Sequence, residues 1–213
     1  KKTEVFRAQF LIETITALQK DLATHNISLI IEQLSPHSGL PDWITKLGIT
    51  DLYYQKEWTR EEQEEEGKVL RCLSSSINIH SHYDQFLFHP EDIPMEIDQL
   101  PEVFTAFRKK FEKYSSVRPC LPSLPTLEGE NLLKEEFHIP STTELGFTPI
   151  EKHPHSAFPF VGGSNAAQER IDHYFWKTEK LSLYKQTRNG LIGIDYSAKL
   201  SAWLANGSIS ARQ

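Results

Sequence analysis

The chain has 213 residues and a formal net charge of −6, and 38% of its residues are hydrophobic. That much apolar material can form a buried core, which excludes a disordered acidic tail. No apolar run approaches the roughly 18 residues that a transmembrane helix needs. The acidic balance also argues against a protein that coats nucleic acid non-specifically.

Two features of the sequence argue against export. Its two cysteines, Cys72 and Cys120, are too few for a disulfide framework and fit a reducing compartment. Residues 1–4 lead into an amphipathic stretch and not into the apolar core of a signal peptide. We therefore expect no membrane partner and no secretion. The expected location is the cytoplasm, or an organelle or the nucleus if the source is eukaryotic.

The first part of the chain alternates between helix and strand patterns. Apolar residues from Phe6 to Leu22 recur at spacings of three and four, which predicts a helix to about residue 25. The patterns that follow predict, in order, a strand over 29–31, a turn over 36–39, a helix around 43–47 ended by Gly48, a strand over 51–54, a helix over 59–73 and a strand over 77–79.

Strands separated by helices of this length predict βαβ units and a parallel sheet, as in a Rossmann-like α/β domain. A βα repeat normally begins with a strand, whereas this chain begins with a helix, so we expect the first strand to be missing. Thr59 and Glu62 have the spacing of a capping box at the start of the third helix.

The second part of the chain predicts a different organisation. A helix is expected over 101–114, with Pro101 at its first position. Residues 115–163 contain seven prolines and are too long for a structureless loop inside one domain, so they predict a connector. Helices follow, the first capped by Ser164 or Asn165. The predicted domains are therefore 1–114 (α/β, partial), 115–163 (connector) and 164–213 (the start of a helical domain).

Charge is divided unevenly along the chain. Residues 164–213 hold seven lysines and arginines against four acidic residues, a balance of +3, which leaves −9 for residues 1–163. Solvated helix faces explain this asymmetry by themselves. The alternative is a C-terminal segment that meets an anionic partner.

Two kinds of residue group in the sequence resemble chemical sites. The histidine pairs at 80 and 82 and at 153 and 155 have no carboxylate or cysteine at a ligand spacing, so no metal site is predicted. Residues 184–201 gather hydroxyls, two cations and backbone N–H groups near a helix start, which suits a diphosphate. A capped helix with surface charges explains the same pattern, and both interpretations stay open on physical grounds.

The same segment resembles the cryptochrome/DNA photolyase family. Residues 184–205, YKQTRNGLIGIDYSAKLSAWLA, resemble the FAD-binding segment of that family, in its cryptochrome DASH branch. Residues 7–13, RAQFLIE, and 101–110, PEVFTAFRKK, resemble two further stretches of the same branch in the same order. The resemblance runs over nearly the whole chain and implies an α/β antenna domain, a long linker and a helical FAD domain.

The resemblance also implies site residues. Tyr184 matches a tyrosine that contacts FAD, and the FAD diphosphate is held by a segment that matches Ser197, Ala198, Lys199, Leu200 and Ser201. Arg188 matches a position associated with DNA phosphate. Glu57 matches the acidic residue that binds a methenyltetrahydrofolate antenna. This sequence departs from the family pattern at Ala198, where a hydroxyl residue is expected, and at two prolines replaced by Ala202 and Ala211.

The activity implied by the resemblance is blue-light-driven repair of cyclobutane pyrimidine dimers, preferentially in single-stranded DNA, by an electron from reduced FAD. No catalytic side chain is implied. The chain is expected to be a fragment that is inactive as a lyase by itself. Two alternatives remain: a blue-light-sensing, nucleic-acid-binding cryptochrome without repair activity, and a non-enzymatic α/β domain that retains only the fold.

Overall fold

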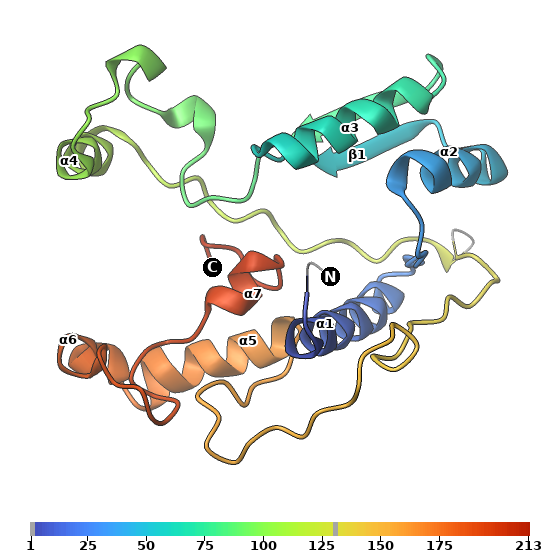
Figure 1. The fold of residues 1–213 in the computed structure, drawn as a ribbon. Helices are drawn as coiled ribbons and strands as arrows, with labels where there is room; N and C mark the ends of the chain where they lie inside the picture. The colour runs from blue at the N-terminus through green and yellow to red at the C-terminus, as the bar shows by residue number, and fades with distance from the viewer. Residues whose placement is uncertain (1–2, 130–131) are drawn as a thin grey trace. The chain divides into compact units, whose positions relative to one another are not determined.

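The computed structural model describes residues 3–129 and 132–213 (Figure 1). The chain divides into two compact units, which are described separately. One contains the chain up to Ile31 together with Leu121–Ala211 and Gln213, and the other contains Glu32–Cys120 with Arg212. These units do not follow the predicted boundaries after residues 114 and 163, which stay a prediction for the domains of the intact protein.

The unit of residues 32–120 has α/β structure. Its elements are α2 (Pro36–Leu47), β1 (Asp51–Gln55), α3 (Arg60–Cys72), β2 (Asn78–His82), the short 3₁₀ helices η1 (Pro90–Asp92) and η2 (Ile97–Gln99), and α4 (Phe104–Tyr114). Strands β1 and β2 pair in parallel, with Asp51 opposite Asn78. The predicted α/β fold with a parallel sheet is therefore confirmed, although only two strands pair within the described residues.

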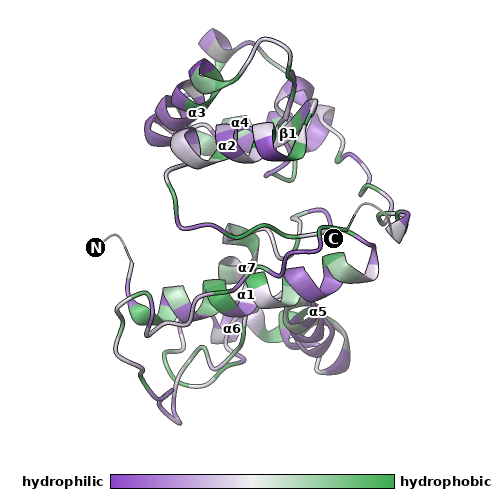
Figure 2. Ribbon diagram, turned by 90° about the vertical axis from the view of Figure 1, so that its right-hand side faces the viewer, coloured by the Kyte–Doolittle hydropathy of each residue, from purple (hydrophilic) through white to green (hydrophobic). Residues whose placement is uncertain are grey.

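Local chemistry explains how the elements of this unit begin and end. Gly48 ends α2 in the left-handed conformation, with φ of 62°, as the sequence predicts. Helix α3 is rich in glutamate and hydrophilic along most of its surface (Figure 2). It packs against α2, and the buried side chains there are Ile44 and Val69.

Four details of the prediction are wrong. Pro36–Gly39 is not a turn but the first turn of α2, because proline suits the first positions of a helix. Helix α4 begins at Phe104, three residues after Pro101. Thr59 precedes α3 without a side-chain cap, and the predicted partner, Glu62, lines a pocket instead. Ser164 does not cap its helix, since Gly163 is the cap and the Ser164 hydroxyl donates to Asp21.

The predicted strand over 29–31 is also wrong. Residues 27–33 have no helix or strand assignment, because a strand forms only where a neighbour completes its hydrogen-bond ladder. The contacts of this stretch are of another kind. Asn26 donates its side-chain amide to Leu127 O, and the Leu133 N–H donates to Ser28 Oγ.

The other unit is built from α1 (Val5–Thr24) and C-terminal helical elements. These are α5 (Ser164–Ile171), the π-helix η4 (Asp172–Lys177), the 3₁₀ helix η5 (Lys180–Leu183), α6 (Tyr184–Thr187) and α7 (Ser201–Ala205). Residues 115–163, coloured from yellow-green to light orange in Figure 1, contain no strand or α-helix in their described part.

The core of this unit surrounds Trp203 of α7, which is completely buried together with Ala167, while Ile209 beside them is 5% exposed. The rings of Phe10, Phe158 and Phe160 lie edge-on or tilted against its indole, at centroid distances of 5.5–5.8 Å. No helix within the described residues is long and apolar enough to cross a membrane.

Candidate functional site

A buried arginine organises the segment for which the family resemblance implies a diphosphate site. Arg170 lies near the end of α5, and its side chain is only 2% exposed. Its guanidinium lies against the rings of Phe160 and Tyr174, at 4.9 and 5.1 Å from their centroids. Arginine is seldom so deeply buried unless its donors are paired.

The donors of Arg170 are all directed at one loop, residues 194–198. Nη1 donates to Asp195 Oδ1 at 2.7 Å, and Nε donates to Ala198 O at 2.9 Å. Nη2 donates to Ile194 O at 2.9 Å and to Ser197 O at 3.0 Å. One side chain therefore holds a carboxylate and three backbone carbonyls of the same loop.

This arrangement fixes where the loop's N–H groups point. Across a trans peptide, the C=O of one residue and the N–H of the next point in opposite directions. Because the carbonyls of Ser197 and Ala198 face Arg170, the N–H groups of Ala198 and Lys199 face away from it. Neither N–H donates to an acceptor within the described residues, so both are available to an anion.

The backbone conformation at Lys199 also favours binding of an anion by this loop. Lys199 has a φ of 63°, in the left-handed region that side chains other than glycine seldom adopt. A left-handed residue in such a loop lets successive N–H groups converge on an anion. The Lys199 ammonium lies over the ring of Tyr196, 3.3 Å from its centroid, and adds positive charge beside the loop.

Asp195 balances the buried guanidinium. Its second oxygen, Oδ2, lies 3.3 Å from His173 Nε2. Burial raises the pKa of the Asp195 carboxyl, but the hydrogen bonds from Arg170 and His173 outweigh it, so this pKa lies below its ordinary value. Asp195 is therefore a carboxylate at neutral pH.

The other predicted residues of this segment have different surroundings. The hydroxyls of Ser197 and Ser201 bond to no partner within the described residues, which leaves them free for a ligand. The side chain of Leu200 packs against the Trp203 core, so only its backbone could meet a cofactor. Tyr184 and Arg188 lie on the exposed surface of the same unit, and Thr187 fixes the loop by donating to Tyr196 O.

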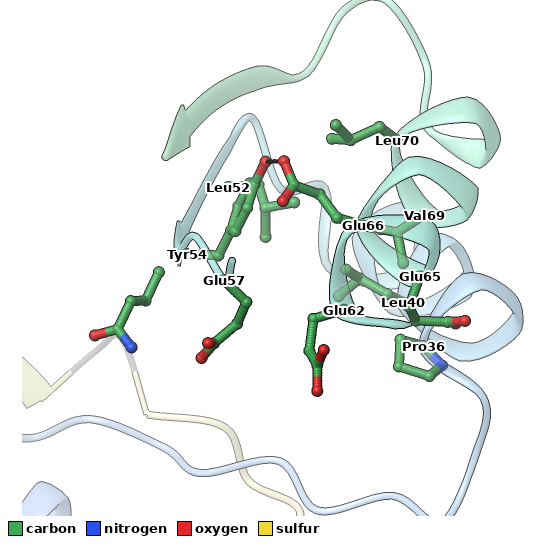
Figure 3. Close-up of a pocket in the computed structure, with 11 residues that line it drawn as sticks. Pro36, Leu40, Leu52, Tyr54, Glu57, Glu62, Glu65, Glu66, Val69 and Leu70 are labelled. Carbon is green, nitrogen blue, oxygen red and sulfur yellow. Dashed lines mark hydrogen bonds between the residues drawn. The ribbon is translucent and has the colours of Figure 1, made fainter. Parts of the chain in front are cut away.

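A second candidate site is a pocket of about 300 Å³ in the α/β unit (Figure 3). Its walls are mostly apolar side chains of α2, β1 and α3, and carboxylates lie around it. It is lined by Pro36, Leu40, Leu52, Tyr54, Gln55, Glu57, Glu62, Glu65, Glu66, Val69 and Leu70. The predicted antenna residue Glu57 is therefore part of an apolar pocket with acidic groups.

Tyr54 in this pocket donates a 2.6 Å hydrogen bond to Glu66 Oε1 (Figure 3). Burial and this carboxylate raise the pKa of Tyr54 to about 12. An unfolded tyrosine ionises near pH 10, so the fold favours the neutral phenol. The resulting stabilisation is complete below about pH 10 and is lost as the pH rises towards about 12.

We therefore expect urea unfolding to show a stability loss between about pH 10 and 12 that Tyr54→Phe reduces. The matched control is Tyr53→Phe, since Tyr53 is 65% exposed on the same strand. Identical pH profiles for the wild-type and Tyr54→Phe proteins would contradict the partly buried hydrogen bond to Glu66.

The family model described as DNA photolyase matches residues 1–127, more than half of the sequence. The chain belongs to the DNA photolyase family. A cryptochrome DASH from Gloeobacter violaceus is 35% identical over 216 residues, and one from Danio rerio is 36% identical over 214. The resemblance seen in the sequence is thereby confirmed for the family, and these relatives carry the name of its DASH branch.

The solved structures agree with this assignment. A cryptochrome from Synechocystis superposes with a TM-score of 0.87 at 34% identity, covering 99% of this chain and 44% of that one. An archaeal photolyase from Sulfolobus tokodaii, whose structure contains two FAD molecules, superposes with a TM-score of 0.73 at 17% identity and supports the fold alone.

This photolyase-family chain matches only part of its relatives. It is aligned over its whole length to the Gloeobacter protein and over 99% of it to the Danio protein, but spans 42% and 41% of their lengths. The activity of the relatives therefore belongs to proteins more than twice as long.

A tomato relative at 34% identity is named as chloroplastic/mitochondrial.

Sequence patterns missed two residues of the site, Arg170 and His173. In the sequence, Arg170 looks like an ordinary helix charge, because its acceptors lie 24–28 residues further along. The one local signal was the run of aromatic residues beside it, Tyr174 and Phe175, which predicts a buried helix face.

Proposed function

We propose that this chain is part of a DASH-type flavoprotein and that residues 197–201 hold the diphosphate of FAD. The observation that carries the proposal is the pair of N–H groups of Ala198 and Lys199, both turned away from Arg170 and without an acceptor in the described part of the chain. Ser197 and Ser201 add two hydroxyls to the same segment. The loop also tolerates the departure at Ala198, because it would use a backbone N–H there and not a hydroxyl.

The chemistry that FAD supplies when bound is light-driven one-electron transfer to a cyclobutane pyrimidine dimer. This chain's own residues would bind and orient the cofactor and meet the DNA. Arg188 is exposed and belongs to the segment with a charge of +3, which suits contact with phosphate. We further propose a preference for single-stranded DNA, because a base outside a duplex costs less to flip into a pocket.

We propose the pocket beside Glu57 as the place of a folate antenna such as methenyltetrahydrofolate. A planar heterocycle fits apolar walls, and its N–H donors suit the carboxylates of Glu57 and Glu62. We also propose a location in the cytoplasm, or in an organelle or the nucleus if the source is eukaryotic.

The second candidate function is blue-light sensing with nucleic-acid binding but without repair. It is favoured by the name cryptochrome of the relatives at 34–36% identity. Both functions use the same flavin segment, so the loop at residues 194–201 does not discriminate between them.

The deciding experiment expresses the complete reading frame that contains these residues and assays pyrimidine-dimer reversal under blue light. We expect bound flavin and light-dependent repair, faster on single-stranded than on double-stranded oligonucleotides. The 213-residue chain alone should show no repair. Bound flavin without repair would favour light sensing, and no flavin at all would overturn both functions.

The role of Arg188 is checked with Arg188→Gln in the same protein. We expect weaker DNA binding for all sequences and a salt dependence whose slope falls by about 1, as for one lost phosphate contact. The control is Arg7→Gln, an exposed arginine on α1. Equal salt slopes for the wild-type and Arg188→Gln proteins would contradict the contact.

A further inference from the structure

Arg170 has more bonds to the loop than a structural ion pair requires. A single salt bridge to Asp195 would balance its charge, yet Nε and Nη2 make three further bonds to the carbonyls of Ile194, Ser197 and Ala198. These bonds fix the orientation of successive peptide planes, which decides the direction of the N–H groups on their other side.

We propose that Arg170 is the positioning residue of the diphosphate site, in that it holds the N–H groups of Ala198 and Lys199 in the direction that receives phosphate oxygens. The proposal rests on the proposed flavin function and adds to it a residue that touches neither the cofactor nor the substrate. Arg170 thus acts on the anion only through the loop.

The geometry requires arginine and not merely a positive charge. The guanidinium carries five N–H donors in a rigid planar fork, whereas lysine carries its donors on one nitrogen. Three separate nitrogens of Arg170 reach acceptors spread over residues 194–198. A lysine would keep the charge beside Asp195 but release most of the carbonyls, so the peptide planes would be free to rotate.

Asp195 also has a part in this arrangement. It shares the buried guanidinium with the carbonyls and is itself held by His173. Without a carboxylate at this position, the buried charge of Arg170 would lack its counter-ion. Asp195→Asn keeps an acceptor oxygen of the same shape, so it should disturb the loop less than a change at Arg170.

The test uses the 213-residue chain, inorganic pyrophosphate as the probe, and backbone amide NMR shifts as the readout. We expect pyrophosphate to shift the Ala198 and Lys199 amides of the wild-type chain. Arg170→Lys should weaken this binding about tenfold or more, and Asp195→Asn by less. The matched control is Arg7→Lys, an exposed arginine of α1, which should leave the affinity unchanged.

A purely structural role of Arg170 predicts a different result. Arg170→Lys would then lower the melting temperature but leave the pyrophosphate affinity of the folded chain unchanged, and this outcome would overturn the proposal. If Arg170→Lys fails to fold, Asp195→Asn is measured instead. A weaker pyrophosphate affinity of the folded variant would support the proposal, and a lower melting temperature with unchanged affinity would overturn it. Unshifted amides in the wild-type chain would also overturn it, whereas absence of flavin from the complete protein would overturn the proposed function.

Discussion

Replacing Trp203 by alanine should lower the free energy of unfolding of its unit by about 3–5 kcal/mol. The indole is completely buried and contacts the rings of Phe10, Phe158 and Phe160. Its Nε1–H also donates to Val161 O at 3.1 Å, so the substitution leaves a cavity and an unpaired carbonyl.

The measurement is urea unfolding followed by far-UV circular dichroism. The matched control is Trp176→Ala, because Trp176 is 74% exposed in the same unit and its loss should change stability by no more than about 0.5 kcal/mol. Trp203→Phe should recover part of the loss through retained ring contacts. A loss of less than about 1 kcal/mol for Trp203→Ala would show that the aromatic cluster is not the core of this unit.

Gly162→Ala should be nearly as damaging, by about 3 kcal/mol, although it adds only one carbon. A Cβ at this position would meet Phe10 O, Thr14 Oγ1 and Thr14 N of α1, all closer than a real Cβ approaches its neighbours. Two of these atoms are backbone and cannot rotate aside. The Gly162 N–H also donates to Glu13 Oε2 at 2.8 Å, which ties the entrance of α5 to α1.

A second glycine provides a control with the opposite sign. Gly67 lies inside α3, and an added Cβ there would meet only the flexible end of Arg71 at 3.3 Å. Since alanine favours helix more than glycine, Gly67→Ala should stabilise by up to about 1 kcal/mol. Equal stability changes for the two substitutions would contradict the close approach at Gly162, as measured by urea unfolding of both variants.

The local chemistry of the sequence was sufficient for much of the α/β unit. The left-handed stop at Gly48 depends on neighbouring residues and appears as predicted. Strands also appear near the predicted positions, at Asp51–Gln55 for 51–54 and at Asn78–His82 for 77–79, where each pairs with the other. The strand over 29–31 does not appear, because strand formation depends on a partner that no local pattern supplies. The cap at Thr59 failed for the related reason that Glu62 faces the pocket.

The candidate site divides in the same way. The sequence by itself marked residues 184–201, because their hydroxyls, cations and family motif are contiguous in the chain. Only the tertiary structure decided which way that segment presents its backbone. The deciding contacts run from Arg170 to carbonyls 24–28 residues away, and the orientation of a peptide plane depends on such partners and not on the residue types within it.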